Sequence, residues 1–251
     1  MPDSLLDHPT VYGSRAKLGV IIPPTNSANE AEWWRLVPAD VTVHSVRMPL
    51  HTDTRSEAGK KALLNDIRRY CSDLAQVGPD VLVYGCTAGS MVSPPAKLAD
   101  AMAAFTGLPS ITTAQSIVQA LRALGLSTVS VGTPYHDLLN EHERQFLEGE
   151  GFRVARIEGL GYGSAGPEEY RNIARITPDA VQALAQRVNS PEADAVLLTC
   201  TDLATLEIIE PLELALDKPV ISSNTATFWH ALRTAGVSDA IAGAGRLLTW
   251  Y

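Results

Sequence analysis

The sequence predicts an α/β fold of two similar Rossmann-like lobes, each with a four-stranded parallel sheet, related by a pseudo-twofold axis. First, short apolar runs rich in β-branched residues alternate with segments of helical period. Second, these runs are apolar throughout, which is typical of parallel strands covered on both faces. Third, the chain resembles itself at an offset of roughly 110 residues.

Eight apolar runs are predicted as strands: Leu18–Ile22, Val41–Arg47, Val81–Gly85, Ser110–Thr112, Thr128–Gly132, Arg153–Glu158, Ala195–Thr199 and Val220–Ser222. Helical period is clearest in five segments between them: Glu57–Val77, Ala114–Leu124, His136–Glu150, Pro178–Val188 and Thr225–Thr234. With 251 residues, of which 45% are apolar, the chain can bury the cores of two medium domains.

The internal repeat aligns three segments in the same order. Asp80–Thr87 corresponds to Asp194–Thr201, and the aspartate lies six residues before the cysteine in both copies. Two further matches pair Pro109–Thr113 with Pro219–Ser223, and the strand ending at Pro24 with the strand ending at Pro134. The repeat therefore predicts a first lobe at residues 16–124 and a second at residues 125–236. The last helix of each copy can cross to pack on the other, and residues 1–15 and 237–251 are expected to be terminal extensions.

Charge and composition narrow the kinds of partner. The net charge is −8 and no basic run occurs, so nucleic acid and anionic membrane are poor candidates and a small-molecule ligand is expected. Residues 1–15 lack the pattern of a signal peptide, and no apolar stretch approaches membrane-spanning length. Three widely spaced cysteines argue against a disulfide framework or a zinc site. We therefore expect a cytoplasmic protein and, as the commonest symmetric assembly, a homodimer.

Two cysteines occupy equivalent places in the repeat. Cys86 and Cys200 each follow an apolar strand directly, and ligands of parallel sheets bind beyond such strand ends. If the two halves face each other, the two thiols confront one another across a cleft. A helix N-terminus or a cation lowers a thiol pKa from its usual ~8.5, so a thiolate and a thiol can flank one planar carbon. Such a pair can move a proton between faces, or add to a carbon and then protonate, without a metal or organic cofactor.

The alternative is that these cysteines have a purely structural role as small buried core residues. Two cysteines at equivalent positions, each followed by threonine, favour catalysis instead. Cys71 has no counterpart in the other copy and is interpreted as structural.

At these residues the chain resembles the aspartate/glutamate racemase superfamily, in the branch of maleate cis-trans isomerases and arylmalonate decarboxylases. The resemblance runs from Lys17 to about Gly236, and its most specific motifs are Gly19–Glu30 and Val131–Tyr135. It implies that the Cys86 thiolate attacks the alkene of maleate and that Cys200 donates or removes the proton at the neighbouring carbon. It also implies carboxylate-binding side chains and backbone N–H groups at Thr25, Asn26, Tyr135, Asn172, Asn224, Thr87, Ala88, Thr201 and Asp202.

Several alternatives remain open. Both cysteines are present, which favours isomerisation or racemisation over decarboxylation, because loss of CO₂ needs one proton donor. The rivals are an amino-acid or hydantoin-type racemase, an arylmalonate-type decarboxylase using Cys200, and a non-catalytic two-lobed binding protein. Locally, Asn26 and Asn224 can equally cap helices, and Tyr135 can be a packing residue. The glycine-rich stretch Gly159–Gly166 lacks dinucleotide-loop spacing and is expected to form a lid or an active-site edge.

Overall fold

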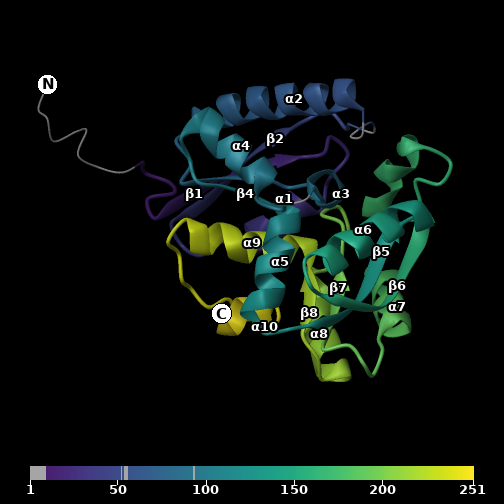
Figure 1. The fold of residues 1–251 in the computed structure, drawn as a ribbon. Coiled ribbons are helices and arrows are strands. Elements are labelled where there is room, and N and C mark those ends of the chain that lie inside the picture. The colour runs from purple at the N-terminus through teal and green to yellow at the C-terminus, as the bar shows by residue number, and fades with distance from the viewer. Residues whose placement is uncertain (1–9, 52, 54–55, 93) are drawn as a thin grey trace, which may run out of the picture.

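The computed structural model describes residues 10–51, 53, 56–92 and 94–251, so residues 1–9 of the expected N-terminal extension lie outside it. The chain forms two four-stranded parallel sheets, with strand orders β2-β1-β3-β4 and β6-β5-β7-β8. The strands are β1 (Ala16–Ile22), β2 (Val41–Arg47), β3 (Val81–Tyr84), β4 (Ser110–Thr112), β5 (Thr128–Tyr135), β6 (Arg153–Tyr162), β7 (Ala195–Leu198) and β8 (Val220–Ser222). The second order repeats the first with every strand number raised by four, which confirms the predicted pair of parallel sheets (Figure 1).

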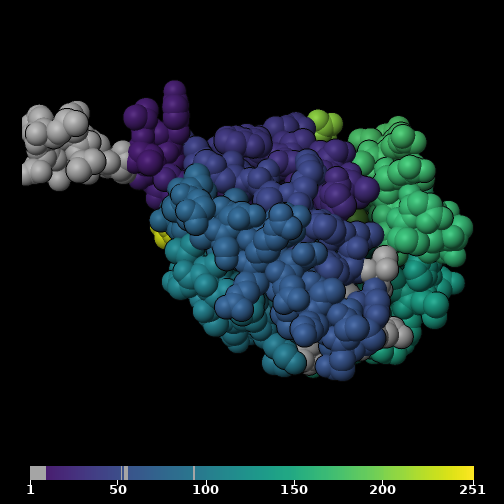
Figure 2. Space-filling model, turned by 90° about the horizontal axis from the view of Figure 1, so that it is seen from above, coloured from purple at the N-terminus to yellow at the C-terminus, as the bar shows by residue number. Residues whose placement is uncertain are grey.

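Helices lie between successive strands and after β8. They are α1 (Asn29–Leu36), α2 (Glu57–Ala75), α3 (Thr87–Ser90), α4 (Lys97–Thr106), α5 (Thr113–Ala123), α6 (Asp137–Gly149), the 3₁₀ segment η2 (Pro167–Arg175), α7 (Pro178–Val188), α8 (Leu206–Leu216), α9 (Ser223–Thr234) and α10 (Arg246–Trp250). We call the first sheet with α1, α2 and α4 the first lobe, and the second sheet with α6, α7 and α8 the second lobe. Seen from above, the first lobe and the green β6–η2 region lie side by side (Figure 2).

Helix caps also repeat between the two copies. The Thr112 hydroxyl accepts a hydrogen bond from the Gln115 N–H at the start of α5, and Ser222 accepts one from the Thr225 N–H at the start of α9. Both caps satisfy an amide that the first helical turn leaves without a partner. The two copies therefore enter their last helix in the same way.

Helices α5 and α9 pack against each other between the two sheets (Figure 1). Helix α9 contacts β8 of its own copy as well as β3 and β4 of the other copy. One apolar core runs through this region and includes Val83 of the first sheet, Phe228 of α9 and Val131 of the second sheet. The expected boundary at 124/125 falls in the turn between α5 and β5, and as a domain boundary it stays a prediction.

Strands β5 and β6 of the second lobe extend further at their carboxyl ends than the sequence predicts. We expected β5 to end at Gly132 and β6 at Glu158, but pairing continues to Tyr135 and Tyr162. Gly159 permits this, because a Cβ there would lie 2.0 Å from the Tyr135 carbonyl oxygen. Half of the expected glycine-rich lid is therefore strand.

The C-terminal segment 237–251 packs on the fold, and Leu247 and Leu248 of α10 are buried in the core that the two sheets share. Within the described part of the chain, no helix has the length and apolar character to cross a bilayer.

Candidate active site

Cys86 lies just beyond the carboxyl end of β3 and serves as the N-cap of the short helix α3. Its side chain is partly buried, and its Sγ accepts hydrogen bonds from the Gly89 N–H and the Tyr84 hydroxyl. A Cβ at position 89 would lie 2.6 Å from the Tyr84 Oη and 3.1 Å from the Cys86 Sγ. Glycine at this position therefore lets the helix, the tyrosine and the thiol meet.

Cys200 lies at the equivalent place beyond β7, but with a different backbone. Its φ is 106°, in the left-handed region that residues other than glycine rarely adopt. Its N–H donates to the Ser223 Oγ at 3.0 Å, and its Sγ accepts hydrogen bonds from the Tyr135 hydroxyl and the Asp202 N–H. The thiol is almost fully buried.

The structure brings the two thiols into one site. Cys86 and Cys200 are close enough to interact electrostatically, and the hydroxyls of Tyr135 and Tyr170 each interact with both of them. This is the convergence of strand ends that the repeat predicts.

Buried hydrogen bonds across the two copies hold this arrangement. Thr201 Oγ1 donates to the Gly85 carbonyl at 3.0 Å and accepts from Asn26 Nδ2 at 3.0 Å. The hydroxyls of Thr87 and Ser223 are 2.9 Å apart. Because buried polar groups are costly to leave unpaired, these bonds fix how the two strand ends face each other.

Desolvation is the largest influence on the pKa of both thiols. Burial raises the pKa of Cys86, although the hydrogen bonds from Gly89 and Tyr84 oppose that rise. Burial, with smaller contributions from Asp202 and Cys86, raises the pKa of Cys200 to about 12, although the hydrogen bonds from Tyr135 and the Asp202 N–H oppose that rise. We expected a helix N-terminus or a cation to lower one thiol pKa, but here desolvation outweighs the short helix α3.

Several predicted binding residues hold the copies together. Asn26 Oδ1 accepts from the N–H groups of Ala28 and Asn29, so this side chain caps the start of α1. Asn224 bonds two side chains of α1, donating to Glu32 Oε2 at 2.7 Å and accepting from Asn29 Nδ2 at 2.8 Å. Each amide keeps one N–H that these bonds do not use.

Asp202 accepts from the Ser27 N–H at 2.8 Å through Oδ1, whereas its Oδ2 is buried without a partner among the described residues. Burial raises the pKa of Asp202 to about 6.

Thr25 and Asn172 lack a described contact with either thiol. Thr25 is exposed, and the Asn172 Oδ1 on η2 accepts from Arg175 Nη1 at 3.3 Å. Ala88 is half-buried and packs against the apolar cluster that contains Cys200. The roles of these residues stay predictions.

Four residues near the thiols escaped the sequence reasoning, namely Tyr84, Tyr170, Glu143 and Ser223. Tyr84 carried a usable signal, because it lies two residues before Cys86 and alternate residues of a strand share a face. Glu143 sits in an acidic helix that resembles a solvated face, yet it is buried and Thr199 Oγ1 donates to its Oε2 at 3.1 Å. Burial raises the pKa of Glu143 to about 8, and its Oε1 has no partner among the described residues.

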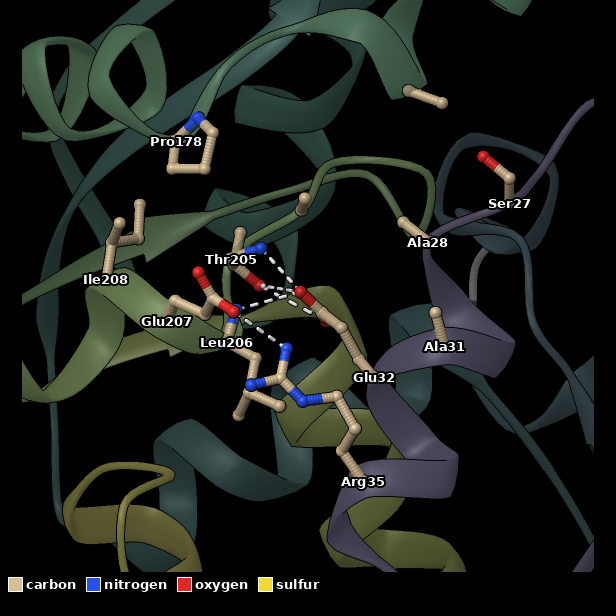
Figure 3. Close-up of a pocket in the computed structure, with 12 residues that line it drawn as sticks. Ser27, Ala28, Ala31, Glu32, Arg35, Pro178, Thr205, Leu206, Glu207 and Ile208 are labelled. Atoms are coloured by element: carbon tan, nitrogen blue, oxygen red, sulfur yellow. Dashed lines mark hydrogen bonds and ion pairs between the residues drawn. The ribbon is translucent and has the colours of Figure 1, made fainter.

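A separate hollow of about 270 Å³ lies between α1 and the start of α8 (Figure 3). Its deepest polar group is Glu32, whose Oε1 accepts from the Leu206 N–H at 2.8 Å and also from the Thr205 N–H. Neither Cys86 nor Cys200 lines it, and we interpret the hollow as part of the junction between lobes. No cluster of three or more His, Cys, Asp or Glu side chains in the described residues could hold a metal ion.

Two parallel α/β lobes that bring a cysteine from equivalent strand ends into one site define an enzyme of the aspartate/glutamate racemase type. The chain belongs to the arylmalonate decarboxylase family, whose model matches residues 18–248.

Relatives with assigned activities cover nearly the whole chain. It is 30% identical to an arylmalonate decarboxylase of Bordetella bronchiseptica, over 93% of this chain and 97% of the relative. It is 29% identical to a maleate isomerase of Nocardia farcinica, over 92% and 95% of the two chains. A solved Nocardia farcinica maleate cis-trans isomerase, a Cys→Ser variant with a covalently bound succinylcysteine intermediate, superposes with a TM-score of 0.83 at 27% identity, over 94% of this chain and 99% of that one.

Proposed function

We propose that this enzyme is a cis-trans isomerase of the maleate isomerase type, acting on a small unsaturated dicarboxylate with Cys86 as nucleophile and Cys200 as acid and base. The observation that carries the proposal is the shared site of two thiols, each hydrogen-bonded to a different tyrosine hydroxyl. One thiol alone suffices for decarboxylation, whereas reversible addition to an alkene uses a nucleophile together with a proton donor.

The proposed reaction balances with these two groups. Cys86 loses its proton to solvent, and its thiolate bonds to one alkene carbon while the π electrons move to the neighbouring carbon. Cys200 gives its proton to that second carbon, which leaves a saturated adduct whose carbon–carbon single bond rotates. The Cys200 thiolate then removes the proton, the carbon–sulfur bond breaks, and the trans alkene leaves.

The contacts of the two thiols support this division of roles. The Gly89 N–H and the Tyr84 hydroxyl stabilise a thiolate at Cys86, which is also the less buried of the two. Cys200 has a pKa of about 12 and lies near the Asp202 carboxylate, so its thiol stays protonated until it transfers the proton to the carbanion.

The succinylcysteine of the Nocardia farcinica relative is the species expected when a cysteine sulfur and a proton add across the alkene of maleate. It supports the addition step for this chain. The unused N–H groups of Asn26 and Asn224, the Tyr135 hydroxyl, and the backbone amides at Thr87–Ala88 and Thr201–Asp202 are the proposed carboxylate donors. In this proposal the Asn172 side chain also gives up its hydrogen bond with Arg175 and donates to a substrate carboxylate.

The test is turnover of maleate followed by proton NMR, in which the maleate alkene signal falls as the fumarate signal rises. Wild type is run beside Cys86→Ser and Cys200→Ser, with Cys71→Ser as the matched control because Cys71 lies within α2 and burial alone raises the pKa of its thiol. We expect both site variants to lose turnover and the control to keep it. A folded wild type that produces no fumarate from maleate contradicts the proposal.

A second candidate is decarboxylation of an arylmalonate, which the family match and the Bordetella bronchiseptica relative favour. This reaction needs Cys200 alone to protonate the carbanion left by CO₂. Release of CO₂ from phenylmalonate that survives Cys86→Ser but not Cys200→Ser would establish it.

A further inference from the structure

Tyr170 lies beside the two thiols. It lies on η2 and packs against the apolar cluster that contains Tyr135 and Cys200. Its hydroxyl is near enough to interact electrostatically with both Cys200 and Cys86. Tyr135 shares this relation to both thiols, whereas Tyr84 interacts with Cys86.

The ring of Tyr170 is held in place by its own segment. Gly163 lies beneath it, where a Cβ would be 2.5 Å from the ring Cε1 and 2.8 Å from the Cζ and Oη. The neighbouring Glu169 accepts hydrogen bonds through Oε2 from the Gly163 N–H at 2.8 Å and the Ala165 N–H at 3.2 Å. The loop at Gly163–Ala165 and η2 are therefore bonded together and fix the position of the Tyr170 ring.

The hydroxyl of Tyr170 is available to a ligand. The Tyr84 hydroxyl is bonded to Cys86 and the Tyr135 hydroxyl to Cys200, whereas no described residue is hydrogen-bonded to the Tyr170 hydroxyl. A group near both sulfurs also faces the substituents of the carbons on which those sulfurs act.

We propose that Tyr170 contacts the substrate and determines its class, donating its hydroxyl to a carboxylate and disfavouring an aryl group at the same place. The inference rests on the proposed function. An apolar ring in that position would leave the hydroxyl without a partner, and sites built to hydrogen-bond a ligand reject analogues that cannot do so. A dicarboxylate supplies the acceptor, whereas the aromatic side of an arylmalonate does not.

The first arm of the test is steady-state kinetics of Tyr170→Phe on maleate. We expect KM to rise about tenfold with kcat changed less than about threefold, as for loss of one uniform binding contact. Gly163→Ala should raise KM in the same direction, because its Cβ displaces the ring. Tyr70→Phe, at a half-buried tyrosine of α2, is the matched control. An unchanged KM in Tyr170→Phe overturns the proposal.

The second arm measures binding without turnover, by calorimetry with succinate and with phenylmalonate. We expect Tyr170→Phe to bind succinate about tenfold more weakly and phenylmalonate at least as tightly as wild type does. If wild type binds succinate but does not isomerise maleate, the proposed function fails while the Tyr170 assignment is still tested by the variant. If wild type isomerises maleate and the variant binds both ligands like wild type, only the Tyr170 assignment fails. A wild type that binds neither maleate nor succinate overturns both.

Discussion

The two halves of the chain present their cysteines on equivalent strands but in different surroundings. In the first half, Cys86 has an ordinary extended backbone and receives its hydroxyl donor from Tyr84 on the same strand. In the second half, Cys200 has a left-handed backbone and receives its donor from Tyr135 on the neighbouring strand. The duplication therefore fixes where the sulfurs lie, whereas local side chains determine how readily each one ionises.

Acidic residues also differ between the surroundings of Cys86 and Cys200. The residue two places after the cysteine is Ala88 in the first half and Asp202 in the second, and the buried Glu143 lies beside Thr199 and Tyr135. The charge of Asp202 raises the pKa of Cys200, since like charges repel in a desolvated site. In the proposed mechanism, this difference between the halves allows one thiol to attack and the other to protonate.

The largest effect should come from removing each sulfur in turn. We expect Cys86→Ser to lose maleate turnover by on the order of 10³-fold or more, because the covalent route disappears. Cys200→Ser should lose about 10²- to 10⁴-fold, as for a general acid. Intact-protein mass spectrometry with maleate should show an adduct on Cys200→Ser and none on Cys86→Ser. An adduct on the opposite variant would reverse the assigned roles.

Tyr84 and Tyr135, which donate to Cys86 and Cys200, should affect different limbs of the pH–rate profile. Tyr84→Phe removes a donor to the Cys86 thiolate, so the pKa of Cys86 rises and the limb that requires the thiolate moves to higher pH. We expect a loss of about tenfold near neutral pH. Tyr135→Phe should instead weaken Cys200 as an acid and raise KM. Identical shifts in both variants would show that the halves are not differentiated.

Thiol reactivity compares the halves without substrate. Measured at pH 8 on the single cysteine-to-serine variants, iodoacetamide should alkylate Cys86 faster than Cys200 by on the order of tenfold. The reason is that Cys86 is more exposed and its thiolate is better stabilised. The rate at Cys200 should still be rising at pH 10, because its pKa is about 12. Equal rates would remove the proposed asymmetry.

The smallest effect concerns folding stability at Glu143. Its pKa is raised from 4.5 to about 8, so the native state holds a proton that the unfolded chain has lost. The free energy of unfolding should therefore fall as pH rises through this window, by about 2 kcal/mol between pH 6.5 and 8.5. Urea unfolding should show that Glu143→Gln lacks this part of the decline, whereas Glu148→Gln, on the exposed face of α6, keeps it. A parallel decline in Glu143→Gln would place the proton elsewhere.

Much of the fold could be predicted because it depends on local pattern and on the repeat. Strands β2, β4 and β8 have the predicted bounds, and β4 and β8 lead directly into α5 and α9. Helices α1, α4 and α8 lie outside the five segments of clearest helical period. Helix α1 shows why, because its buried face includes the polar side chains of Asn29 and Glu32, whose partners lie in the other copy.

The candidate site could likewise be predicted only where it depends on the repeat. The repeat alone predicts that Cys86 and Cys200 lie in one site, since equivalent strand ends meet about a pseudo-twofold axis, and their catalytic roles stay a prediction. Tyr170 could not be placed, because its position depends on a loop that folds across from β6. The bonding of Asn224 to α1 likewise required the relative orientation of the lobes.

The left-handed backbone at Cys200 has a consequence for how such enzymes change over time. A residue with a Cβ at that conformation costs on the order of 1–3 kcal/mol, and glycine would relieve it. Selection for thermal robustness alone would therefore favour glycine at this position, whereas the proposed chemistry requires the cysteine sulfur. In variants that no longer need the reaction, we expect Cys200→Gly to raise the melting temperature.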